Sequence, residues 1–172
     1  MKVNFLDFEI DKLTESVEHV ITGKSFATDV SLLLLKDLKQ VTKKNGWMFN
    51  WKKELHRPES GVYKLTIRGE PDVIQGLISI STKEGHIFMD LIESAASNRG
   101  KNKVYLGVPG NLVAFVCNLS FQRGFDGFVG FHAKTKLIDH YKDQLGARQH
   151  GGQLMVIDNK AARKLIDKYF KQ

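Results

Sequence analysis

Hydrophobic positions in the first sixty residues change their spacing, and each spacing predicts a different element. Residues 3–10 alternate incompletely between hydrophobic and polar side chains, which predicts an opening strand. Hydrophobic positions recur at helical spacing over residues 13–21, and Thr28 followed by Asp29 is typical of the start of a second helix, which closes at residues 45–46. The N-terminal region is therefore expected to fold as a strand and two helices.

The next region alternates with period two, which is the pattern of half-buried strands. Residues 62–68 form the first run, and a turn at residues 69–72 leads into a second run at residues 73–82. A three-residue connection that ends in Gly85 joins this run to a third at residues 86–92, as in a β-hairpin. Three consecutive antiparallel strands are predicted.

Residues 107–112 form a glycine-bearing turn that leads directly into an apolar helix at residues 113–123, and a further strand follows at residues 128–131. A strand, a turn and a helix in this order direct several backbone N–H groups and the positive end of a helix dipole at one spot. This arrangement suits a phosphate group held by the backbone. A glycine before a helix also serves simply to turn the chain, and the pattern alone leaves that alternative open.

The last third predicts a helix, a strand pair and a terminal helix. Thr135 caps the first helix, which carries Tyr141 and ends at Gly146, and residues 148–157 follow as a short strand pair. The aromatic segment at residues 47–51 fits no regular element. It forms either one wall of a substrate pocket or a cover over the edge of the core.

Composition changes this picture mainly through charge. The 172 residues suit one domain, expected over residues 1–172, and 42% hydrophobic with 26% charged residues is ordinary for a globular protein. The formal charge of +7 indicates an anionic partner, which can be a nucleic acid, an acidic protein or a phosphorylated small molecule. A basic cluster lies at residues 99–103, and a second one in residues 160–171 is interpreted as the solvated face of the terminal helix.

Several classes of site and location are disfavoured. The single cysteine, Cys117, allows no internal disulfide and no thiolate cluster, and it is interpreted as a buried, inert thiol. His132 and His150 have no partner at metal-ligand spacing, so no metal is expected. With no apolar run near the roughly 18 residues of a membrane span and no signal-peptide pattern, a cytoplasmic location is expected. A homodimer remains possible.

Two motifs resemble those of the GNAT superfamily of N-acetyltransferases. Residues 99–101 followed by residues 107–112 are similar to the family signature Arg/Gln-x-x-Gly-x-Gly/Ala and its later leucine, with Gly107 at the first glycine and Leu112 at the leucine. Residues 137–147 resemble the family helix that bears a tyrosine shortly before Leu-Gly-Phe. The predicted order of elements is also similar. The resemblance implies an α+β fold whose central, mostly antiparallel sheet of about six or seven strands has flanking helices and a C-terminal helix.

The resemblance further implies acetyl-CoA as cosubstrate. Its pyrophosphate is expected on the N–H groups of residues 107–112, with added charge from Lys101 or Lys103. Its thioester is expected between the strands at residues 86–94 and 128–131, where a backbone N–H polarises the carbonyl. The implied coenzyme contacts are Ile92, Ser94, Lys101, Gly107, Val108, Gly110, Asn111 and Leu112.

Two residues, each with an alternative, are the candidates for proton transfer in such a site. Glu93 is the candidate base, or else a strand-end residue that points to solvent. Asp90 is held in reserve and would face the opposite side of a regular strand. Tyr141 is the candidate acid toward the coenzyme thiolate, or else a core residue with its hydroxyl at the rim, and His140 is the alternative acid.

The implied function is N-acetyl transfer to a primary amine of a small molecule or a protein. The alternative is a catalytically inactive binding module with this fold, which engages nucleic acid or an acidic protein through its basic surface. Two departures from the family pattern favour that alternative. Pro109 removes one backbone donor, and Arg99 lies further from Gly107 than the family arginine, whose position is held by Val104.

Overall fold

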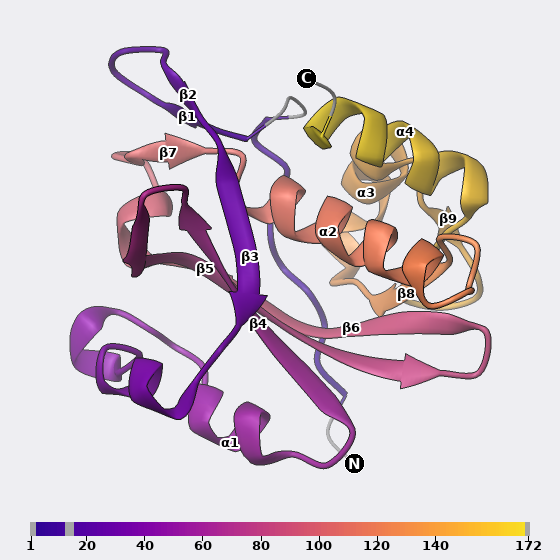
Figure 1. The fold of residues 1–172 in the computed structure, drawn as a ribbon. Coiled ribbons are helices and arrows are strands. Elements are labelled where there is room, and N and C mark those ends of the chain that lie inside the picture. The colour runs from indigo at the N-terminus through magenta and orange to yellow at the C-terminus, as the bar shows by residue number, and fades with distance from the viewer. Residues whose placement is uncertain (1–2, 13–15, 171–172) are drawn as a thin grey trace.

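The computed structural model describes residues 3–12 and 16–170, which are organised around a mixed sheet of seven strands (Figure 1). Across the sheet the strands are β3 (Thr28–Leu32), β4 (Ser60–Ile67), β5 (Glu70–Lys83), β6 (His86–Ser94), β8 (Val129–His132), β10 (Leu154–Ile157) and β9 (Arg148–Gln149). Neighbouring strands are antiparallel except β6 and β8, which run parallel. A parallel pair needs a crossover connection, and a helix supplies it here.

The helices cover both faces of this sheet. They are α1 (Trp51–His56), α2 (Val108–Gln122), α3 (Ile138–Leu145) and α4 (Asn159–Phe170), with short 3-10 turns η1 (Leu35–Lys39), η2 (Lys43–Asn45), η3 (Ala96–Asn98) and η4 (Thr135–Leu137). The crossover helix α2 packs against α4, β5 and β6. No helix in the described part of the chain has the length and apolar character that a membrane crossing requires.

Because side chains alternate with period two along the β4–β5–β6 meander, they contribute to two separate hydrophobic cores, one on each face of the sheet. Ile78 and Ile80 of β5 point into the main core together with α2 and α4, whereas Leu77 points into a smaller one. That smaller core contains Trp47 and Trp51, which are 6% and 1% exposed. The aromatic segment thus anchors η2 and α1 to the sheet.

A second, small sheet fixes the chain just before α2. It consists of β2 (Ser25–Phe26), β1 (Val17–His19) and β7 (Tyr105–Leu106), all antiparallel. Because β7 leads directly to Gly107, this sheet ties the N-terminal region to the first turn of α2.

The predicted fold class is confirmed. The three central strands, the crossover helix, the strand after it and the two last helices occur where the sequence predicts them. One boundary differs: α2 begins at Val108, five residues before the predicted start. Pro109 lies in its first turn, where a missing N–H costs no helical hydrogen bond.

Both predicted N-terminal helices are wrong. Val17–His19 is a strand paired on both edges, and residues 13–15 lie outside the described part of the chain. Thr28–Leu32 is the edge strand β3, in register with β4, because the open edge of β4 takes up its backbone groups. The predicted opening strand at residues 3–10 makes one parallel bridge, between Leu6 and Ala133.

Two buried tyrosines make the fold sensitive to alkali. Burial raises the pKa of Tyr169, with Asp11 adding to the effect, and burial likewise raises the pKa of Tyr141. In the unfolded chain both tyrosine hydroxyls ionise at about pH 10, so above that pH the unfolded state loses protons that the native state keeps. Stability is therefore fully present below about pH 10 and falls above it, by up to about 1.4 kcal/mol per pH unit for each tyrosine. Urea unfolding of wild type and Tyr169→Phe between about pH 8 and pH 11 tests this. The variant should show the shallower decline, and equal slopes would contradict the assignment.

Candidate active site

The parallel pairing of β6 and β8 is short, and the two strands separate beyond it. They pair only at Ile87 with Val129 and at Phe88 with Gly130. A register shift leaves Asp90 as an extra residue in β6, because Ser79 pairs with Leu91 while Ile80 pairs with Met89. An opening between β6 and β8 results, on the side toward the end of β6.

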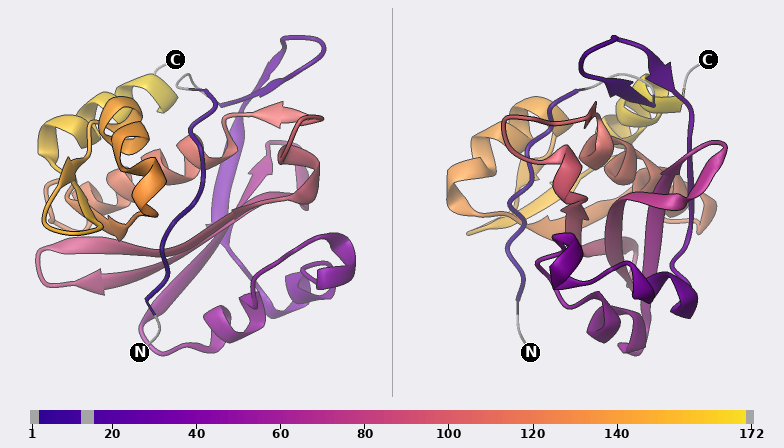
Figure 2. Two further views of the ribbon diagram at one scale, coloured as in Figure 1. Left: turned by 180° about the vertical axis from the view of Figure 1, so that it is seen from behind. Right: turned by 90° about the vertical axis from the view of Figure 1, so that its left-hand side faces the viewer.

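A cavity of about 700 Å³ lies at this opening. One part of its lining is the end of β6, residues 91–94, with residues 98–100 and 103; Met48 and Phe49 of the aromatic segment also line it, as one of the two interpretations of that segment predicts. The opposite wall is the N-terminal segment, by which we mean residues 3–12; its residues 3–9 and 11 line the cavity. Seen from behind, the N-terminal segment crosses the molecule between α3 and the loop before β7 (Figure 2, left).

The N-terminal segment is bonded to the end of β8. The N–H of Leu6 donates to the carbonyl of His132 at 2.7 Å, and the N–H of Lys134 donates to the carbonyl of Leu6 at 3.0 Å. Leu6 and Ile10 are buried, whereas Phe5, Asp7 and Glu9 are exposed. The segment therefore behaves as a short extra strand at the edge that β8 leaves free.

The predicted phosphate turn already holds an anion of the chain itself. Gly107 has φ 96°, in the left-handed region that glycine tolerates, and its N–H donates to Asp11 Oδ1 at 2.9 Å. Lys103 Nζ lies 2.9 Å from Asp11 Oδ2. A backbone donor at a helix start and a lysine thus bind one carboxylate.

The other residues of the turn are covered. Val108, Gly110, Asn111 and Leu112 are buried. The Asn111 side chain donates to the carbonyl of Ser16 at 2.7 Å, and Tyr169 of α4 packs directly on Gly110, so closely that a Cβ there would clash. Among the predicted coenzyme contacts, Ile92 and Ser94 line the cavity, and Lys101 is exposed in the adjoining loop.

Glu93 is 5% exposed and fully engaged. Its carboxylate accepts from the N–H of Met48 at 2.7 Å, from the N–H of Phe49 at 3.3 Å and from Trp51 Nε1 at 2.7 Å. Arg99 lies 3.4 Å from the same carboxylate. These contacts give Glu93 a structural role, and its service as a base stays a prediction. The sequence contains no signal for this anchor, because its three N–H donors lie more than forty residues away.

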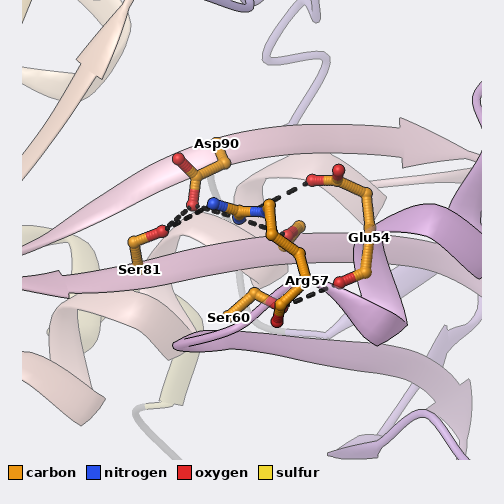
Figure 3. Close-up of polar contacts among 6 residues, drawn as sticks. Glu54, Arg57, Ser60, Ser81 and Asp90 are labelled. Carbon is orange, nitrogen blue, oxygen red and sulfur yellow. Dashed lines mark hydrogen bonds and ion pairs between the residues drawn. The ribbon is translucent and has the colours of Figure 1, made fainter. Parts of the chain in front are cut away.

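Asp90 and Glu93 do not face opposite sides, because the strand bulge at Asp90 breaks the alternation. The Asp90 carboxylate pairs with Arg57 at 2.9 Å and accepts from Ser81, beside Glu54 at the end of α1 (Figure 3). Glu93 also contacts α1, through Trp51. The prediction that Asp90 lies on the other face is therefore wrong, and its carboxylate is held in a polar network away from the cavity.

Both candidate acids on α3 contact the N-terminal segment. The Tyr141 hydroxyl donates to the carbonyl of Phe8 at 2.6 Å, and His140 Nε2 accepts from the N–H of Ile10 at 2.9 Å. Tyr141 is buried, and burial raises its pKa, so its hydroxyl stays protonated at neutral pH and is a weaker acid than an exposed tyrosine. Its assignment as the catalytic acid stays a prediction.

The single cysteine is a buried thiol. Cys117 is fully buried in α2, and burial raises its pKa to about 12, which keeps the thiol protonated. Within the described residues no group of three or more His, Cys, Asp or Glu side chains could hold a metal ion.

Comparison with known proteins identifies the fold of this chain. No family model and no curated sequence matches the chain. Solved structures do. A GNAT-family acetyltransferase from Staphylococcus aureus is 10% identical, with 77% of this chain and 99% of the other covered and a TM-score of 0.51. A chimeric spermidine N-acetyltransferase from Vibrio cholerae is 12% identical, with 79% and 98% covered and a TM-score of 0.53. The ribosomal-protein-S18-alanine N-acetyltransferase from Escherichia coli is 12% identical, with 76% and 94% covered and a TM-score of 0.52.

The chain has the GNAT fold. At these identities the likeness extends to the architecture alone. Within the GNAT fold of this chain, the opening between β6 and β8 and the start of α2 lie at the positions where the sequence resemblance predicts the coenzyme.

We expect Glu93→Ala to destabilise the protein by about 3–5 kcal/mol, because it leaves buried N–H donors and the Arg99 charge without their acceptor. Glu93→Gln keeps one acceptor oxygen and should cost less. Urea unfolding measures both, with Glu84→Ala in the exposed β5–β6 turn as a control expected within about 0.5 kcal/mol of wild type. If Glu93→Ala left the protein as stable as that control, the result would contradict a structural role for Glu93.

Proposed function

We propose that the chain is an N-acetyltransferase that moves an acetyl group from acetyl-CoA to a primary amine of a small molecule or a protein. The anion held at the start of α2 carries this proposal. There, in a GNAT fold, the Gly107 N–H and Lys103 bind a carboxylate beside a cavity of about 700 Å³. The same donors suit a phosphate oxygen, because both ligands are oxyanions and a helix N-terminus favours negative charge.

The chain's own residues suggest how such a ligand would be held. Gly107 and Lys103 would bind the pyrophosphate, with Lys101 nearby in an exposed loop. Beyond Phe88, the β6 edge toward β8 has no paired partner strand, so its backbone groups are available to the acyl and pantetheine parts. Ile92 and Ser94 line the cavity at this edge.

Acetyl-CoA supplies an activated thioester: a C–N bond to the amine forms as the C–S bond breaks, the amine gives up one proton and the thiolate takes one. Tyr141 is the candidate donor because its hydroxyl is protonated at neutral pH, although burial raises its pKa and so makes it a weaker acid. Glu93 can accept the amine proton only by giving up one of its donors, which are three N–H groups and Arg99.

A second candidate function, a nucleic-acid-binding module, is favoured by a group of lysines on η1, η2 and α1. We call it the lysine face: Lys36, Lys39, Lys43, Lys44, Lys52 and Lys53. All six are exposed, and none forms an ion pair with a side chain that the structure describes. The acids that lie among them in the sequence, Asp37 and Glu54, are buried. Exposed Phe49 lies beside α1 and can stack on a base.

Binding of acetyl-CoA, measured by calorimetry, and acetyl transfer to a panel of primary amines test the leading proposal. Gly107→Glu should weaken coenzyme binding at least about tenfold, because it sets a carboxylate against the phosphates. Gly107→Ala is the matched control, since it shares the positive φ and the close approach to the Ser16 carbonyl but adds no charge. Absence of binding by wild type at millimolar coenzyme, or equal binding by the Gly107→Glu and Gly107→Ala variants, would contradict the proposal.

The lysine face is tested by fluorescence anisotropy with a short RNA oligonucleotide at several salt concentrations. The triple variant Lys43→Glu, Lys44→Glu, Lys52→Glu should lose at least about tenfold in affinity and show a smaller salt dependence. The triple variant Lys160→Glu, Lys164→Glu, Lys168→Glu on the exposed side of α4 changes the net charge equally and should lose less. Equal losses of affinity in the two triple variants would show non-specific electrostatic attraction. Binding of polyglutamate but not of RNA would indicate that the partner is an acidic protein instead.

A further inference from the structure

The N-terminal segment contacts the same groups that the proposed function assigns to the coenzyme. Asp11 binds Gly107 and Lys103, the Phe8 carbonyl accepts from the Tyr141 hydroxyl, and Leu6 bonds to the end of β8 inside the opening. We propose that this segment is an intramolecular competitor of the coenzyme, so that the site opens only when residues 3–12 leave it. The inference rests on the proposed function.

The competition is most direct at Asp11. One of its carboxylate oxygens takes the Gly107 N–H and the other takes Lys103, both at 2.9 Å. A pyrophosphate at the same place would need these donors and would meet a like charge at contact distance. The Asp11 side chain is 14% exposed, so solvent screens that repulsion weakly. Binding of the two anions is therefore mutually exclusive.

The competition extends along the segment through its backbone. The Phe8 carbonyl accepts the hydrogen bond of the Tyr141 hydroxyl, which is the group predicted to protonate the thiolate. Two residues further, the N–H of Ile10 donates to His140 Nε2, so both candidate acids on α3 are engaged. Carbonyl and N–H groups of an extended chain thus use the contacts that a long polar ligand would use.

Besides these polar contacts, only a few side chains of the segment pack inward, which favours its release. Leu6 and Ile10 are buried in the main core, and Phe8 packs on Phe131 and Tyr141 at ring distances of 6.5 and 5.0 Å. Between these anchors, Asp7 and Glu9 are exposed. If the open state is a minor fraction of the molecules, the apparent affinity for the coenzyme falls by that fraction.

Calorimetry with acetyl-CoA on full-length variants tests the inference. Asp11→Asn keeps the size of the side chain and removes the competing charge, and it should bind at least about tenfold more tightly than wild type. Asp72→Asn is the control, because it changes the net charge equally from an exposed position on β5. It should bind like wild type.

Hydrogen exchange supplies a readout that needs no substitution. Backbone amides of residues 3–12 in wild type should exchange faster as acetyl-CoA is added. The inference would be overturned if wild type and the Asp11→Asn variant bound acetyl-CoA equally and residues 3–12 stayed protected in the complex. Coenzyme binding and acetyl transfer would in that case leave the proposed function intact. Competitive release without acetyl transfer would support the inference and contradict the proposed function. No binding by either protein would contradict both.

Discussion

The separation of β6 from β8 is the constraint on which the rest of the site depends. The two strands are joined through α2, so the start of that helix comes close to the end of β6. Because their pairing stops after two residue pairs, an edge of each strand is left without its neighbour. Buried backbone groups must find partners, and the edge of β8 finds them in Leu6. The N-terminal segment therefore stabilises the edge of β8 and lines the candidate site in one arrangement.

Two carboxylates at this opening show how different anchoring suits different roles. Glu93 is 5% exposed and accepts from three N–H groups, which fixes the loop at residues 46–51 against the end of β6. Asp11 also binds an N–H and a cation, but it belongs to a segment that carries only a few buried side chains. A carboxylate whose loss would leave several buried donors unpaired is costly to move, whereas under the proposed competition Asp11 would be exchanged for another anion.

The sequence could predict the elements in which local pattern and tertiary structure agree. The β4–β5–β6 meander alternates with period two, and α2 and α3 carry apolar stripes and glycine ends. The prediction failed at Thr28–Leu32, because a cap-like Thr-Asp pair also fits an edge strand and only pairing with β4 decides. In the site, Gly107 and Tyr141 belong to motifs, whereas Asp11 lies 96 positions from Gly107 and Phe8 lies 133 from Tyr141. No local signal announces such contacts, since only the folded sheet brings these residues together.

The charge distribution explains why departure of the segment would matter to an anionic ligand. The net charge of +7 is not concentrated at the opening, because Lys103 pairs with Asp11, Arg99 with Glu93 and Lys134 with Asp7. While the segment is in place, these cations are neutralised locally and attract a phosphate only weakly. Its departure would free Lys103, Lys134 and the Gly107 N–H together and remove the Asp7 and Asp11 charges. One movement would thus change a neutralised opening into a cationic one, which couples access to the site with attraction of the ligand.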